Sequence, residues 1–110
     1  MLEFDHIALS VPNIGDAVRF YVHSFPQSNI LHQDDTWAFL QVDSLKIAFV
    51  LEEEHPPHLA FRVDSEEELN RLASKSNATI VIHRDGSKSF YEDDPGGNAI
   101  EVIFYPPVTP

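Results

Sequence analysis

Apolar and polar residues alternate along two stretches of the chain that lie about half a chain length apart. The first, FDHIALSV, places Ile7, Leu9 and Val11 on one side of a strand and His6 on the other. The second, PHLAFRV, repeats the pattern with His58 in the place of His6. The two histidines are 52 positions apart (58 − 6 = 52) in a chain of 110 residues. This spacing predicts an internal repeat.

A helical period follows each of these strands. PNIGDAVRFYVHSF spaces its apolar side chains for one helix face and offers Asn13 as a cap, which predicts a helix over about residues 13–24. DSEEELNRLASKS places Glu68 three positions after Ser65, the spacing of a capping box, and its apolar residues follow the same period. Each half of the chain therefore begins with a strand and a helix.

Three short strand patterns complete each half. Turn-forming residues in QDDT, VDSL, RDGS and DDPGGN separate them. We expect these strands at 27–33, 36–42 and 45–52, and at 79–84, 87–92 and 99–105. The order is strand, helix, strand, strand, strand in each half, so the chain is predicted to be an α+β protein of two βαβββ modules. The modules would cover about residues 1–54 and 55–110, joined at EEEHPP within a single domain.

Composition narrows the classes of partner. The net charge of −11, with only seven Lys and Arg, disfavours nucleic acids and anionic membranes. No apolar run approaches the roughly 18 residues of a membrane span, and the first residues do not resemble an export signal, so we expect a soluble, cytoplasmic protein. Because the chain contains no cysteine, any metal would be bound by His, Asp or Glu.

One carboxylate is predicted to share a face with the two histidines. In the last strand, Glu101 points away from the side that receives the helix, and its strand neighbours are apolar. Burying an unpaired carboxylate costs several kcal/mol, and a hydrogen-bonded partner or a cation removes that cost. A divalent ion would bind His6, His58 and Glu101 together. The alternatives are structural histidines that bond to backbone and a glutamate in water at a strand edge.

Three stretches together resemble the vicinal oxygen chelate superfamily: DHIALSVPNIGDAVRFY, PHLAFRV and SFYEDDPGGNAIEVI. This superfamily includes glyoxalase I, extradiol dioxygenases, methylmalonyl-CoA epimerase and bleomycin resistance proteins. The resemblance implies paired modules whose mixed sheet curls around a central metal cavity, within one chain or across a homodimer. It places metal ligands on the first and fourth strands of the modules, which are His6, His58 and Glu101 here, with Ala48 at the fourth position.

The resemblance implies a small enzyme that uses one divalent ion to act on an oxygen-chelating small molecule, by lyase, dioxygenase-like, ring-opening or hydrolytic chemistry. Two histidines and one carboxylate suit Fe, Mn, Ni, Co or Zn. Since Ala48 supplies no second carboxylate, a proton transfer would need another catalytic group such as His83 or Tyr91. The alternative is a non-catalytic small-molecule or drug-binding protein of the bleomycin resistance type. The acidic net charge of the chain favours this alternative, whereas the presence of three predicted metal ligands disfavours it.

Further side chains are candidates for contacts with the substrate. Arg62 shares the face of His58 and would attract an anionic substrate, or would pair with a nearby acid. Trp37 and Phe39 would form the wall of a pocket, or would pack in the core. Tyr91 would hydrogen-bond a bound substrate, or would be a partly buried aromatic residue.

Overall fold

A computed structural model describes residues 2–51, 53 and 56–107 of the protein. The elements are, in order, β1 (Leu2–Val11), α1 (Ile14–Ser24), β2 (Ser28–Gln33), β3 (Trp37–Val42), β4 (Leu45–Leu51), β5 (His58–Val63), α2 (Glu66–Ser76), β6 (Val81–Ile82), β7 (Lys88–Asp93) and β8 (Ala99–Phe104). The βαβββ order therefore occurs twice, and the predicted α+β class is confirmed. Within the predicted joint, residues 52, 54 and 55 lie outside the described part of the chain. Among the described residues, no helix is long and apolar enough to cross a membrane.

The chain divides into two compact units. The N-terminal unit is His6–His58, and the C-terminal unit is Leu59–Pro110 together with Met1–Asp5. Strand β1 contributes to both units, because its first residues pack with β5 through a ring contact between Phe4 and Phe61. The internal repeat did not predict that the start of the first module belongs with the second.

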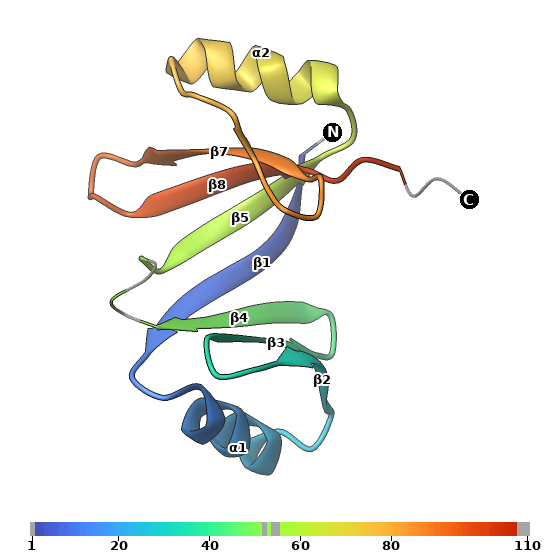
Figure 1. Cartoon of the computed structure of the whole chain (residues 1–110), viewed down its shortest axis with the longest axis vertical. Coiled ribbons are helices and arrows are strands. Elements are labelled where there is room, and N and C mark those ends of the chain that lie inside the picture. Colours follow the sequence, from blue (N-terminus) through green and yellow to red (C-terminus); the bar gives the residue numbers. More distant parts are fainter. Residues whose placement is uncertain (1, 52, 54–55, 108–110) are drawn as a thin grey trace. The chain divides into compact units, whose positions relative to one another are not determined.

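The N-terminal unit is a mixed sheet covered by one helix. Its strand order is β2-β3-β4-β1, with β1 parallel to β4 and the other pairs antiparallel. Figure 1 shows α1 lying across this sheet. Ile14 and Val18 on α1 are buried against Leu40 and Phe49 of the sheet. Ile7, Leu9 and Val11 pack on the same cluster, which confirms the predicted core face of β1.

The C-terminal unit repeats this arrangement. Its strand order is β5-β8-β7-β6, and both β7–β8 and β6–β7 are antiparallel. Helix α2 (Figure 1) buries Leu69 and Ala73 against Phe90 and Val102. Since Val102 faces the helix, its neighbour Glu101 faces the other side of the sheet, as the alternation of the sequence predicted.

Both helices begin at the predicted caps. Asn13 accepts a hydrogen bond from the Asp16 amide at 2.8 Å, and Ser65 accepts one from the Glu68 amide at 3.1 Å. At the other end of α2, Asn77 adopts the left-handed conformation (φ 58°) that ends many helices. These caps satisfy backbone groups that the helix itself leaves without partners.

The Ser65 cap provides a test of this local structure. Replacing Ser65 by alanine removes the acceptor for the Glu68 amide, so we expect the free energy of unfolding to fall by about 1 kcal/mol. Urea denaturation measures the change. Ser76→Ala, at the exposed last position of α2, is the matched control and should change stability by less than about 0.5 kcal/mol. Equal effects of the two substitutions would contradict the capping role.

The predicted strand over residues 79–84 is wrong in length, because β6 contains only Val81 and Ile82. The chain turns immediately afterwards. The His83 amide donates to the Ser87 carbonyl at 2.8 Å, and Asp85 accepts bonds from both the amide and the hydroxyl of Ser87. These local bonds close a hairpin and leave no residues to extend the strand.

Candidate metal-binding site

The N-terminal unit brings two predicted metal ligands together. His6 lies on β1 and His58 is the first residue of β5, and their ring centroids are 5.5 Å apart at 74°. An ion bound to one nitrogen of an imidazole lies roughly 3 Å from that ring's centroid, so rings at this separation can share one ion. Both side chains are partly buried. The pairing joins residues at the two ends of this unit.

A backbone carbonyl sets the orientation of the His58 ring. Nδ1 of His58 lies 3.2 Å from the carbonyl oxygen of Pro56, and this oxygen can only accept a hydrogen bond. Nδ1 therefore carries the proton in the neutral ring, and Nε2 keeps its lone pair. Histidines that bind metals are commonly oriented in this way by a carbonyl or a carboxylate.

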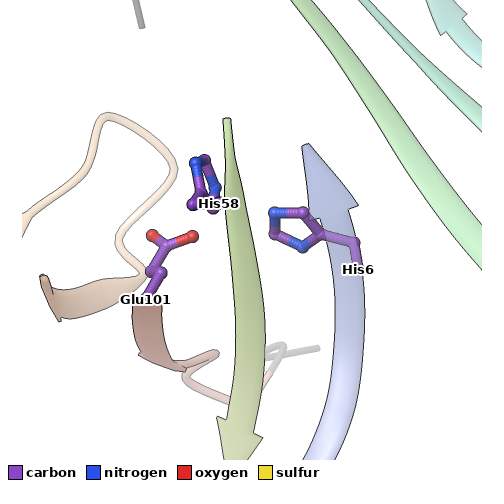
Figure 2. Close-up of side chains that lie close together, drawn as sticks. All are labelled: His6, His58 and Glu101. Carbon is purple, nitrogen blue, oxygen red and sulfur yellow. The ribbon is translucent and has the colours of Figure 1, made fainter. Parts of the chain in front are cut away.

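The third predicted ligand belongs to the C-terminal unit. Glu101 on β8 is 4% exposed. Figure 2 draws it with the two histidines, and each of the three side chains offers one atom able to bind a metal, an imidazole nitrogen or a carboxylate oxygen. Within its own unit, the carboxylate has polar neighbours on β7 and after β6, so its burial is partly compensated there.

Tyr91 lies opposite Glu101 in the β7–β8 register. Burial first, and then the negative charge of Glu101 and a hydrogen bond to it, raise the pKa of the Tyr91 hydroxyl far above its usual value. Tyr91 therefore stays protonated at neutral pH and donates to the carboxylate. This places the tyrosine as a hydrogen-bond donor and makes it a poor general base.

His83 is the second polar neighbour of the carboxylate. Its Nε2 lies 2.6 Å from the hydroxyl of Ser89 and 3.7 Å from Oε2 of Glu101. Ser89 is fully buried on β7 and was not among the predicted site residues. The signal that could have identified it is its alternation with Tyr91, which puts both on one face of β7. His83, Ser89, Tyr91 and Glu101 form one polar cluster.

The position that the resemblance assigns to a fourth ligand carries no ligand. Ala48 pairs with Ala8 in the parallel β1–β4 register and with Phe39 across β3–β4. It therefore lies on the face of the sheet that also carries His6. A methyl group cannot bind a metal, so this face supplies the imidazoles and no carboxylate at this position.

Arg62 is paired with acids of the same unit. Its guanidinium donates to Asp5 at 3.1 Å and also contacts Glu3. The Tyr105 hydroxyl donates to the other oxygen of Asp5 at 2.9 Å, and Asp5 is 6% exposed. We call Asp5, Arg62 and Tyr105 the Asp5 cluster. The acid pairing named above as the alternative for Arg62 is thus present, and its role in substrate binding stays a prediction.

Trp37 does not belong to the core of its unit. Ala38 and Leu40, on the other face of β3, are fully buried against α1, whereas Trp37 is 40% exposed. Phe39 shares the face of Trp37 and lies edge-on to His6, with centroids 5.8 Å apart. Core packing is therefore wrong for Trp37. The two aromatic residues lie on the same side of the sheet as the imidazole pair.

Comparisons with known proteins give the fold a name. No family model matches the sequence, and no curated protein matches it. Solved structures do match. A hypothetical protein of Bacillus halodurans C-125 has a TM-score of 0.74 and 22% identity, covering 99% of this chain and 98% of that one.

Two further matches indicate the fold. Methylmalonyl-CoA epimerase of Mycobacterium tuberculosis has a TM-score of 0.69 and 18% identity, over 96% of this chain and 89% of that one. A glyoxalase/bleomycin resistance protein/dioxygenase superfamily member of Vibrio splendidus 12B01 has a TM-score of 0.68 and 14% identity, over 94% of this chain and 98% of that one. The chain therefore has the fold of the vicinal oxygen chelate superfamily.

Proposed function

We propose that the protein binds one divalent metal ion through His6, His58 and Glu101 and acts on a small molecule that chelates this ion with two oxygens. The metal would be Fe, Mn, Ni, Co or Zn, since two imidazoles and one carboxylate suit these ions. The similar structures include an epimerase and a protein described as glyoxalase, bleomycin resistance protein or dioxygenase, and such chemistry is the class proposed here.

The observation that carries the proposal is the convergence of two imidazoles from separate strands. His6 and His58 are 52 positions apart in the sequence, yet their centroids are 5.5 Å apart. The bond from His58 to the Pro56 carbonyl holds one ring in the tautomer that leaves Nε2 for a metal. A structural histidine could make the same backbone bond, so the feature that favours a shared ion is the second imidazole beside the oriented ring.

The donor set fits a divalent ion. The two imidazole nitrogens are neutral donors, and the Glu101 carboxylate, buried on an otherwise apolar strand, would supply negative charge. Three protein ligands leave positions open for a substrate. When bound, the ion would polarise the oxygens of a chelating substrate and stabilise the negative charge that develops on them.

The residues around Glu101 have separate tasks in this proposal. Tyr91, held protonated, donates to the carboxylate and orients it. His83 contacts the buried hydroxyl of Ser89 and is the group able to accept a proton beside the carboxylate. With Ala48 in the fourth position, a reaction that needs a base would depend on His83.

Metal titration tests the proposal. Protein purified without a nickel column and stripped with a chelator should bind one ion of Mn, Fe, Co, Ni or Zn per chain in calorimetry. At an ion concentration 100 times Kd, binding should add about 2.7 kcal/mol to the free energy of unfolding. The absence of both stoichiometric binding and thermal stabilisation with all five ions would overturn it.

A second candidate function is a non-catalytic protein that binds small molecules, and the exposed Trp37 beside Phe39 favours it. The two functions differ in what the histidines do. Ligand binding that survives the double substitution His6→Ala and His58→Ala would support the binding protein. Loss of turnover with either single substitution would support the enzyme.

A further inference from the structure

Five aromatic rings of the N-terminal unit follow one another across a single face of its sheet. His32 stacks on Trp37 with centroids 4.3 Å apart at 24°, and Trp37 lies 6.1 Å from Phe39. Phe39 lies 5.8 Å from His6, which in turn lies 5.5 Å from His58. The row thus runs from the imidazole pair to the edge strand β2. We call it the ring row.

A β-bulge places His32 in the ring row. In the β2–β3 register, Ile30 pairs with Leu40, but His32 pairs with Phe39, so Leu31 is an extra residue. Residues directly opposite in an antiparallel pair point to the same face. Without the bulge His32 would face the helix side with Ala38. Bulges commonly redirect a side chain toward a site.

A side-chain contact with Asp34 then holds the redirected ring. Nε2 of His32 lies 2.9 Å from a carboxylate oxygen of Asp34. The other oxygen of Asp34 accepts bonds from the amide and hydroxyl of Thr36 and from the Trp37 amide. The imidazole is therefore held flat against the indole by groups of the same short turn. A binding surface that is rigid before the ligand arrives loses less entropy on binding.

The charge around the ring row limits what can bind to it. Asp34 contacts His32 directly, Asp35 follows in the same turn, and the chain as a whole carries a net charge of −11. An anionic ring would be repelled there. The face of an indole also attracts cations. A neutral or cationic ring is therefore favoured.

We propose that Trp37 and Phe39, with His32 behind Trp37, bind a planar aromatic group of the ligand that is uncharged or cationic. This inference deepens the proposed function, because the row ends at His6 and His58, where the oxygens of the same ligand would reach the ion. The ligand would then be an aromatic or heteroaromatic compound that also carries a pair of oxygens, separated from the ring bound at Trp37 by the Trp37–Phe39 and Phe39–His6 spacings of 6.1 and 5.8 Å. Short aliphatic acids would leave the ring row empty.

The single tryptophan of the chain makes the test direct, since all indole fluorescence comes from Trp37. The probes are quinoline, N-methylquinolinium, naphthalene-2-sulfonate and cyclohexanol, added to protein stripped of metal. We expect saturable changes in fluorescence with the first two, at Kd below about 1 mM. The sulfonate should bind at least tenfold more weakly, and cyclohexanol should cause no saturable change.

Variants measured by calorimetry assign the binding to the ring row. Trp37→Leu should weaken quinoline binding roughly tenfold, and His32→Ala should weaken it less, since its ring acts through Trp37. Trp37→Phe keeps a ring and should restore part of the affinity. Phe20→Leu is the matched control, because Phe20 is a 63% exposed aromatic residue on α1, and it should leave the affinity unchanged.

Three results would overturn the inference. They are a linear, unsaturable response to quinoline, equal affinities in Trp37→Leu and Phe20→Leu, and sulfonate binding as tight as that of quinoline. Because these experiments use metal-free protein, they separate this inference from the proposed function. A protein that binds quinoline but no metal would overturn the metal site alone.

Discussion

Replacing His58 by alanine is expected to weaken metal binding by more than about 100-fold, and replacing His6 should do the same. Loss of a partner that only orients a ligand already costs 10- to 100-fold in affinity, so loss of a ligand should cost at least the upper value. Competition with a chromophoric chelator measures the affinities. His23→Ala is the matched control, since His23 is exposed at the end of α1, and it should bind metal like the unchanged protein.

Glu101→Gln tests the contribution of the other unit. An amide oxygen is a weaker and uncharged ligand, so we expect affinity to fall by at least tenfold while the fold is retained. If Glu101→Gln keeps full metal affinity while the His6 and His58 variants lose it, the imidazole pair binds the ion without the carboxylate. Equal affinities in His58→Ala and His23→Ala would contradict the site altogether.

Among the proposed substitutions, breaking the Asp5 cluster should lower the free energy of unfolding most. Arg62→Met removes the cation from an acid whose side chain is only 4% exposed, and the Tyr105 hydroxyl is retained as its donor. Removing one partner of a fully buried pair costs 3–5 kcal/mol. Because Arg62 is itself 37% exposed, water reduces this effect, and we expect a loss of about 2 kcal/mol.

Urea denaturation of matched variants checks this prediction. Arg71→Met is the control, because Arg71 is 66% exposed and pairs only loosely with Glu68, at 3.6 Å. It should change stability by less than about 0.5 kcal/mol. The double variant Asp5→Asn with Arg62→Met should be more stable than the sum of its single effects predicts, because the acid that lost its partner is then neutral. Additive effects would show that the ion pair contributes little.

The members of the Asp5 cluster come from the strands that carry the predicted ligands, and Asp5 immediately precedes His6 on β1. Arg62 lies on β5 with His58, and Tyr105 follows β8, the strand of Glu101. Each strand that supplies a predicted ligand therefore leads to one member of the cluster. The alternation of the sequence placed Arg62 on the face of His58, but nothing near it in the sequence indicated Asp5 as its partner.

The sequence by itself determined the elements and their faces. The period of apolar residues predicted both helices, and the caps at Asn13 and Ser65 were visible as residue types at fixed spacing. Strand alternation predicted that Glu101 would face away from the helix. Its apolar strand neighbours predicted that it would be buried, and it is 4% exposed. These features depend on interactions between residues that are close in sequence, so a local pattern is enough to predict them.

Only the tertiary structure decided the pairings between distant strands. The bulge that turns His32 toward Trp37 depends on the register of β2 against β3, and the sequence left that register open. The bond from Arg62 to Asp5 joins residues 57 positions apart. Such contacts arise from which strands lie side by side and in which register, and this is set by the packing of the whole unit rather than by any short stretch of residues.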